Sequence, residues 1–146
     1  MSRRARGRWP GRQQNLSWAF RATTYQCALG AIRVSKHHAW LDQWLVTCQC
    51  RQWVWLTADN PGALRCADEV NLASQERLIG MLEKEGVVFM PASARGDGDL
   101  WPVEQGFLIA GMKLLRAKRL GRQFGQVALL HGVVGSRARI IWLAAN

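Results

Sequence analysis

The stretch QWVWLTA, residues 52–58, gives the clearest indication of the fold. Its aromatic and β-branched residues favour a β-strand. Successive side chains of a strand point to opposite faces. One face then carries Trp53, Trp55 and Thr57, and the other carries Val54, Leu56 and Ala58. Because both faces are apolar, we expect this strand to lie in the centre of a sheet that is covered on both sides.

The segments on either side of this strand alternate between strand and helix patterns. The turn residues Asn60-Pro61-Gly62 end the strand. Upstream, residues 24–34 favour β structure, in which Gly30 marks either a bulge or a turn between two short strands, and Ser35 is a good N-cap for a helix over residues 36–48. Downstream, the patterns predict a helix over residues 68–84, a strand over 87–92, a loop over 94–99, a strand over 107–110, a helix over 112–125, and a hairpin of strands over 126–132 and 137–144. This order predicts one α+β domain, in which about three helices cover a mixed or mainly antiparallel sheet.

The positive charge of the chain is concentrated near its start. The net charge is +10, and Asp42 is the first acidic residue. Eight basic residues precede Asp42, whereas residues 42–146 carry 12 basic and 10 acidic side chains. We therefore divide the chain into a basic leader, residues 1–22, which we expect to be disordered, and a single α+β domain, residues 23–146.

The leader does not resemble a secretory signal. No apolar segment follows its paired arginines, Arg3 and Arg4. No apolar run in the chain reaches the roughly 18 residues that a membrane-spanning helix needs. We therefore expect a cytoplasmic protein with no membrane partner. An organellar transit peptide is the alternative interpretation of the Arg-rich leader.

The sequence offers no recognisable metal, cofactor or catalytic site. Cys48 and Cys50 have C-x-C spacing, which fits tetrahedral zinc poorly, and the loop around Asp97 is too short for a calcium loop. There is no Ser–His–Asp pattern and no phosphate-binding Gly-Lys-Ser loop. Glu104 could act as a general base only if burial raised its pKa. We expect no metal and no cofactor, predict no catalytic residue, and favour a non-enzymatic function.

Five polar residues fall where strands end or helices begin: Thr57, Asn60, Asn71, Glu104 and Gln126. Ligand sites in sheet proteins commonly gather at such positions. A carboxylate among amides could form hydrogen bonds with a sugar, a nucleoside or a backbone amide. The alternative is that these side chains only satisfy backbone groups at turns and helix ends, and so hold the fold together.

The motifs that contain these residues resemble, in their order, the bacterial family called domain of unknown function 3293. They are T-A-x-N-P at residues 57–61, E-x-G-F at residues 104–107 and F-G-Q at residues 124–126. The resemblance extends over roughly residues 24–143. The chain departs from the family pattern at Asp59, where an aromatic or small residue is expected, and at Asn71, which does not directly follow Glu69. The resemblance implies a fold and a bacterial source, and it implies no reaction.

We consider two functions. The leading hypothesis is a small, non-catalytic domain that binds a ligand or a partner through the five polar residues. The alternative is association with nucleic acid through the basic leader and the basic face of the helix over residues 112–125. The residues that would carry this alternative are Arg3, Arg4, Arg6, Arg8, Arg12, Lys113, Arg116, Arg119 and Arg122. A solvated basic tail without a partner is the simpler explanation of the leader.

Overall fold

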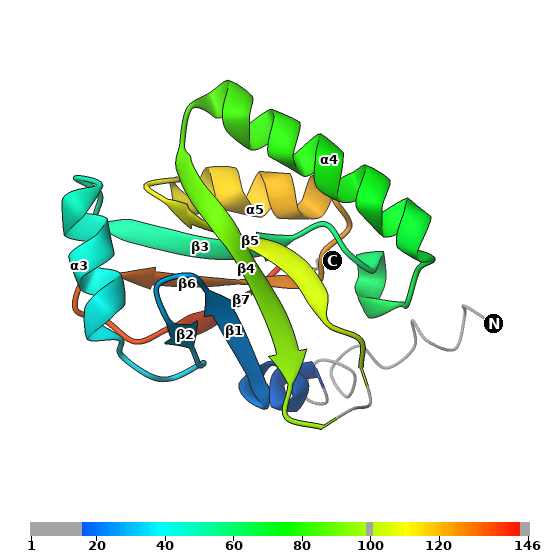
Figure 1. The fold of residues 1–146 in the computed structure, drawn as a ribbon, viewed down its shortest axis with the longest axis horizontal. Helices are drawn as coiled ribbons and strands as arrows, with labels where there is room; N and C mark the ends of the chain where they lie inside the picture. The colour runs from blue at the N-terminus through cyan, green and yellow to red at the C-terminus, as the bar shows by residue number, and fades with distance from the viewer. Residues whose placement is uncertain (1–15, 99–100, 144–146) are drawn as a thin grey trace.

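The predicted strand over residues 52–58 lies inside an antiparallel sheet. It forms β3 (Gln52–Thr57) in the computed structural model, which describes residues 16–98 and 101–143. Across this described part of the chain, seven strands follow the order β2-β1-β4-β5-β3-β6-β7 (Figure 1). Every neighbouring pair is antiparallel. The predicted α+β domain with a mainly antiparallel sheet is therefore confirmed.

The other strands flank β3 on both sides. They are β1 (Thr23–Cys27), β2 (Ala31–Ile32), β4 (Val88–Gly96), β5 (Glu104–Ala110), β6 (Ala128–Val133) and β7 (Arg139–Trp142). β1 and β2 pair antiparallel on either side of Gly30, so of the two alternatives for this residue the turn is correct and the bulge is wrong, and β6 and β7 form the predicted hairpin.

Helices cover one face of the sheet and lie near its ends. α4 (Asp68–Glu85) and α5 (Leu114–Gln123) run side by side over one face, and α3 (Ala39–Thr47) lies near one end (Figure 1). A short helical segment, residues 16–21, precedes β1, and the 3₁₀ turn η1 (Pro61–Ala63) follows β3. In the described part of the chain, no helix has both the length and the apolar character that crossing a membrane requires.

The sheet curls into an open half-barrel. The segment after β2 meets the segment before β7, where the Ser35 backbone N–H donates to the Ala138 carbonyl at 2.8 Å and the Ala138 N–H donates to the Lys36 carbonyl at 2.9 Å. Phe20, which precedes β1, also contacts Trp142 of β7: the two rings meet edge to face with their centres 5.9 Å apart. These contacts draw the two edges of the sheet toward each other and enclose an interior.

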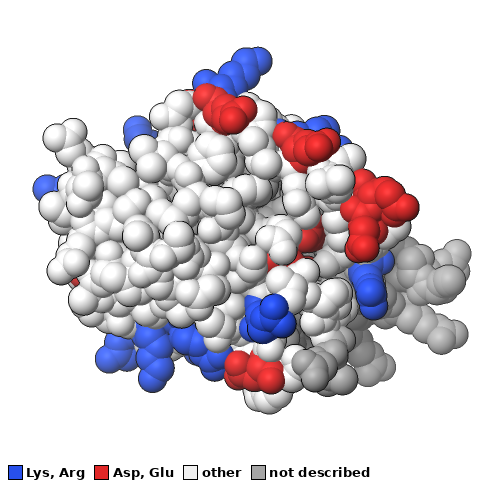
Figure 2. All heavy atoms as spheres, in the orientation of Figure 1, with Lys and Arg blue, Asp and Glu red and all other residues white. Residues whose placement is uncertain are grey.

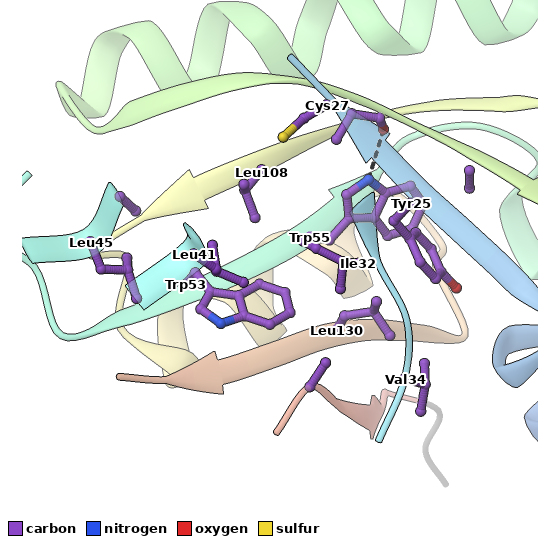
Figure 3. Close-up of a cluster of buried hydrophobic side chains, with 14 residues drawn as sticks. Tyr25, Cys27, Ile32, Val34, Leu41, Leu45, Trp53, Trp55, Leu108 and Leu130 are labelled. Carbon is purple, nitrogen blue, oxygen red and sulfur yellow. Dashed lines mark hydrogen bonds between the residues drawn. The ribbon is translucent and has the colours of Figure 1, made fainter. Parts of the chain in front are cut away.

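The two faces of β3 contribute to two separate apolar cores. Trp53 and Trp55 point into the half-barrel, where they pack with Tyr25, Ile32 and other apolar side chains (Figure 3). The dashed line in Figure 3 is the hydrogen bond from Trp55 Nε1 to the Ala92 carbonyl, at 2.8 Å. The second core lies between the sheet and helices α4 and α5, and it includes Val54, Leu56, Leu78, Leu82, Ala117 and Leu120. This arrangement explains why β3 is apolar on both faces.

Two glycines make room for the tryptophans of β3. A Cβ at Gly132 would lie 2.5 Å from Nε1 of Trp53, and a Cβ at Gly106 would lie 2.4 Å from Cζ2 of Trp55. Both distances are shorter than any normal contact between non-bonded atoms. The indole rings therefore lie directly on the backbones of β6 and β5, which fixes how far each ring reaches into the half-barrel.

Three sequence expectations differ from the structure. Ser35 is not the N-cap of a helix, because α3 starts at Ala39 and Ser35 occupies a turn with φ of 72°. The predicted loop over residues 94–99 is wrong in its first part, because β4 continues to Gly96 by pairing with β1. Residues 16–22 were assigned to the leader, yet residues 16–21 are helical and Phe20 contacts Trp142. The rest of the leader, residues 1–15, lies outside the described residues.

Candidate functional site: a strand-end network beside an aromatic cleft

The end of β3 carries a connected set of polar side chains. Thr57 Oγ1 donates to the Gln105 carbonyl of β5 at 2.5 Å and accepts the Asp59 backbone N–H at 3.0 Å. Thr57, Asp59 and Asn60 are all buried. Hydrogen bonds described below connect these residues with four others, and we call the whole set the strand-end network: Thr57, Asp59, Asn60, Asn71, Gln75, Glu104 and Gln126.

Asn60 and Asn71 bind each other through two hydrogen bonds. The Asn60 backbone N–H donates to Asn71 Oδ1, and Asn71 Nδ2 donates to Asn60 Oδ1, both at 2.9 Å. Asn60 Oδ1 also accepts the Cys66 backbone N–H at 2.9 Å. Asn60 has a left-handed backbone, with φ of 50° and ψ of 61°, which lets the chain turn sharply from β3 into η1. The first turn of α4 is thereby attached to the end of the central strand.

Asp59 attaches the same strand end to three further segments. Its Oδ1 accepts Gln75 Nε2 at 2.6 Å, and its Oδ2 accepts the Gln105 backbone N–H at 2.9 Å. Its carbonyl accepts Gln126 Nε2 at 3.0 Å, and Gln126 also donates to the carbonyl of Phe124 at the end of α5. Helix α4, strand β5 and the segment after α5 therefore meet at one residue.

Glu104 is the member of the network that lines the cleft containing Trp101. Its Oε2 accepts Asn60 Nδ2 at 2.8 Å and Trp101 Nε1 at 3.1 Å. Burial, and secondarily the charge of Asp59, raise the pKa of the Glu104 carboxyl, although the two hydrogen bonds oppose this shift. A general base would need a shift of the same direction, so the shift alone does not distinguish catalysis from binding.

The cleft beside Glu104 has a volume of about 390 Å³ and is lined mainly by apolar side chains. We call it the aromatic cleft. Its lining residues come from the helical segment 16–21, from β1, β3 and β4, and from the start of β5. Five of them are aromatic: Trp18, Phe20, Tyr25, Trp55 and Trp101. The cleft thus opens into the end of the half-barrel, a place where sheet proteins commonly bind small molecules.

A second cleft, of about 350 Å³, borders four other members of the network. Asp59, Asn60, Asn71 and Gln75 line it together with residues of the η1–α4 connection and of residues 102–105. These four polar side chains already bond to one another or to backbone groups. A ligand in this cleft would therefore compete with existing hydrogen bonds, whereas Glu104 lines the aromatic cleft and only its Oε2 accepts the hydrogen bonds from Asn60 and Trp101.

A family model described as "Protein of unknown function (DUF3293)" matches residues 56–129. The chain belongs to this family. The matched segment begins in β3 and ends in β6, so it includes every member of the strand-end network. Searches of curated proteins and of solved structures found no match. The family resemblance seen in the sequence motifs is confirmed.

All five polar residues predicted from the sequence of this DUF3293 chain lie in one network, although their roles differ. Thr57, Asn60, Asn71 and Gln126 bond within the protein, and Glu104 adjoins the aromatic cleft. Sequence reasoning missed Asp59, Gln75 and Trp101. Asp59 lies inside the T-A-x-N-P motif, and Gln75 lies one helical turn after Asn71, so helix periodicity could have indicated it.

The basic residues proposed for nucleic-acid binding are less free than the sequence suggests. Arg116 forms an ion pair with Glu85, and Arg122 donates to the Leu143 carbonyl at 3.2 Å. Lys113 and Arg119 are exposed at α5. On the face shown in Figure 2, acidic side chains lie over α4 and a group of basic side chains lies along the lower left edge. The leader arginines Arg3, Arg4, Arg6, Arg8 and Arg12 lie outside the described residues.

The described histidines and cysteines do not form a metal site, and His131 has a structural role in the sheet. Across residues 16–98 and 101–143, no group of three or more His, Cys, Asp or Glu side chains is arranged to hold a metal ion. His131 is buried between its neighbours in the sheet, where Nε2 contacts Gln52 Oε1 at 3.1 Å and Nδ1 accepts Arg139 Nε at 3.3 Å. Burial, together with the charge of Arg139, lowers the pKa of His131 to about 4.

Proposed function

We propose that this protein is a non-catalytic binding domain whose ligand is a small organic molecule held in the aromatic cleft. The observation that carries the proposal is the position of Glu104. One oxygen of its carboxylate is held by Asn60 and Trp101, while the residue itself lines the cleft. A fixed polar group on an otherwise apolar wall is the usual arrangement by which a binding site orients its ligand.

The rest of the strand-end network supports this role by holding Glu104 in place. Asn60 donates to Glu104 and is itself fixed by Asn71 and by the Cys66 backbone N–H. Because both oxygens of Asp59 are also occupied, the network has little freedom to rearrange. A binding group held in this way loses little conformational entropy when a ligand arrives, which favours affinity.

The size of the cleft supports a small molecule rather than a protein surface. Its volume of about 390 Å³ lies in the range of roughly 300–1,000 Å³ that is typical of small-molecule sites. We propose a cytoplasmic location in a bacterial cell, which subcellular fractionation would test. Association of the basic residues with nucleic acid stays the alternative prediction, and an electrophoretic shift at two salt concentrations would test it.

The test of the proposal is to fill the cleft. Gly96 lines the cleft, and a Cβ there would lie at an ordinary distance of 3.7 Å from its nearest atom, the Gly98 carbonyl oxygen, so the backbone has room for the Cβ of Gly96→Leu. We expect the full chain to bind the neutral fluorescent dye N-phenyl-1-naphthylamine, and Gly96→Leu to weaken this binding by about tenfold, or about 1.4 kcal/mol.

The matched control is Arg95→Leu, which places the same leucine side chain at the adjacent, exposed position of β4 in place of arginine. Arg95 does not belong to the residues that line the cleft, so we expect dye binding to be unchanged. No dye binding by the native chain, or equal binding by both variants and the native chain, would contradict the proposal. Thermal unfolding of each variant shows whether it is folded.

A further inference from the structure

The charge of the aromatic cleft is opposite to that of the whole protein. The chain has 20 basic and 10 acidic residues. Among the described residues that line the cleft, however, the charged side chains are Asp97 and Glu104, and there is no Lys, Arg or His. The described lining of the cleft, which has carboxylates and no cationic side chain, is poorly suited to an anionic ligand.

The two acidic residues are not equivalent. Asp97 forms a two-pronged ion pair with Arg33, at 2.7 Å and 3.2 Å, so its charge is already compensated at the rim. Glu104 receives hydrogen bonds from the neutral groups of Asn60 and Trp101, which do not compensate its charge. The site therefore presents one uncompensated carboxylate.

Aromatic side chains line the same cleft as this carboxylate. The bond from Trp101 Nε1 places that indole beside Glu104, and Tyr25 and Trp55 meet edge to face with their ring centres 4.7 Å apart. Trp18 and Phe20 bring two further rings to the cleft from the helical segment 16–21. The faces of aromatic rings attract cations, most strongly where water is excluded. A carboxylate among aromatic rings is a recurring way to bind an organic ammonium group.

We infer that the ligand of the aromatic cleft is an organic cation: a protonated amine or a quaternary ammonium that carries an apolar group. The ammonium lies against the Glu104 carboxylate and the surrounding rings, and the apolar group fills the mouth of the half-barrel. This inference rests on the proposed function, because it names the ligand class of the same cleft.

The acid–base behaviour of the site gives the inference a second test. The titratable and charged groups around Glu104 are Asp59 and Tyr25, with the Arg33–Asp97 pair at the rim. Burial raises the pKa of Glu104 in the free protein, whereas a bound cation favours the ionised form and lowers it. A cation must therefore bind more tightly as pH rises through the Glu104 titration. A neutral ligand that accepts a hydrogen bond from protonated Glu104 would show the opposite dependence.

The experiment uses three probes of similar size with the full chain: 2-phenylethylamine, which is a cation near neutral pH, neutral 2-phenylethanol and anionic phenylacetate. Isothermal titration calorimetry measures each affinity. We expect 2-phenylethylamine to bind at least about tenfold more tightly than either of the others. We also expect its affinity to rise between pH 4 and pH 7.

Glu104→Gln keeps the shape of the side chain and its ability to accept from Asn60 and Trp101, but removes the charge. We expect it to lower the affinity for 2-phenylethylamine about tenfold and to leave that for 2-phenylethanol within about twofold, which also shows that the cleft is intact. The matched control is Glu83→Gln on the exposed face of α4, which changes net charge equally and lies outside the cleft. It is expected to leave all three affinities unchanged.

The outcomes separate the inference from the proposal beneath it. If 2-phenylethanol or phenylacetate binds as tightly as the amine, or if the amine's affinity is insensitive to Glu104→Gln, the cation inference fails while ligand binding stands. If the dye binds and none of the three probes does, the cation inference fails as well. If neither the dye nor any probe binds, the proposed function fails.

Discussion

At the scale of single residues, Asn60 combines a backbone role with a side-chain role. Its left-handed backbone turns the chain out of β3, and Asn adopts this conformation more readily than most residues that carry a Cβ. Its side-chain amide both donates and accepts, so it can bind Glu104, Asn71 and the Cys66 backbone N–H at once. Glycine would satisfy the first requirement only, and alanine neither.

This double role predicts an unusual order of stability at position 60. Asn60→Gly should lower the free energy of unfolding by about 2–3 kcal/mol, because buried polar partners lose their hydrogen bonds. Asn60→Ala should be less stable than Asn60→Gly by about 0.5–1 kcal/mol, since alanine is strained at a φ of 50°. Urea unfolding monitored by circular dichroism measures both. The explanation is wrong if the alanine variant is at least as stable as the glycine variant.

At the scale of elements, β3 depends on glycines in its two neighbours. Trp53 lies opposite Gly132 of β6, and Trp55 lies over Gly106 of β5. In each case the glycine of the neighbouring strand has no side chain, which leaves space for the indole ring. The size of the interior is therefore set jointly by large residues on the central strand and by missing side chains beside it.

A matched pair of glycine substitutions tests this packing. Gly132→Ala should lower the free energy of unfolding by about 1–3 kcal/mol, because the added Cβ would meet the Trp53 ring at 2.5 Å. Gly80→Ala, at an exposed position of α4 where a Cβ meets nothing within 4 Å, should raise it by about 0.5–1 kcal/mol. Chemical denaturation of both variants provides the measurement, and a stable Gly132→Ala protein would show that the interior is loosely packed.

The predictions from sequence succeeded for elements whose cause is local. Residues 52–58 are apolar on both strand faces, and this pattern identified β3. Gly86 follows the last residue of α4 with φ of 72°, as expected for a glycine at the end of a helix. The predictions failed where contacts with segments distant in the sequence determine the local structure. Ser35 has the chemistry of an N-cap, but its backbone N–H bonds to Ala138 across the closing sheet. Residues 94–96 have loop-like composition, but pairing with β1 extends β4 through them.

At the scale of the whole molecule, His131 connects strands from different parts of the sheet. It lies on β6, contacts Gln52 of β3 and accepts from Arg139 of β7. Its ring must stay neutral to accept that bond, and protonation would place a second positive charge beside Arg139. The lowered pKa of about 4 follows from this arrangement.

The shift predicts how His131 contributes to stability in acid. In the unfolded chain its pKa is about 6.5, so the unfolded state takes up the proton first as pH falls. Stability linked to His131 is therefore complete above about pH 6.5 and is lost progressively as pH falls toward the folded-state pKa of about 4. Between pH 7 and pH 5 the native chain should lose about 1–2 kcal/mol more than His131→Gln. Parallel urea titrations at the two pH values provide the check, and equal losses would show that His131 does not control this transition.

The class of fold, and the placement of the five polar residues at strand ends and helix starts, could be predicted from the sequence alone. Strand and helix periods, turn residues and the apolar stripe of α5 are local properties, and the positions of Thr57, Asn60, Asn71, Glu104 and Gln126 at element ends follow from them. The long-range packing of the chain brings these residues into one network and places Glu104 beside the aromatic cleft. Asn60 and Glu104 are 44 positions apart, and Asp59 and Gln126 are 67 positions apart. Such pairs meet because the sheet curls and the helices pack against it, and local sequence patterns do not encode that long-range geometry.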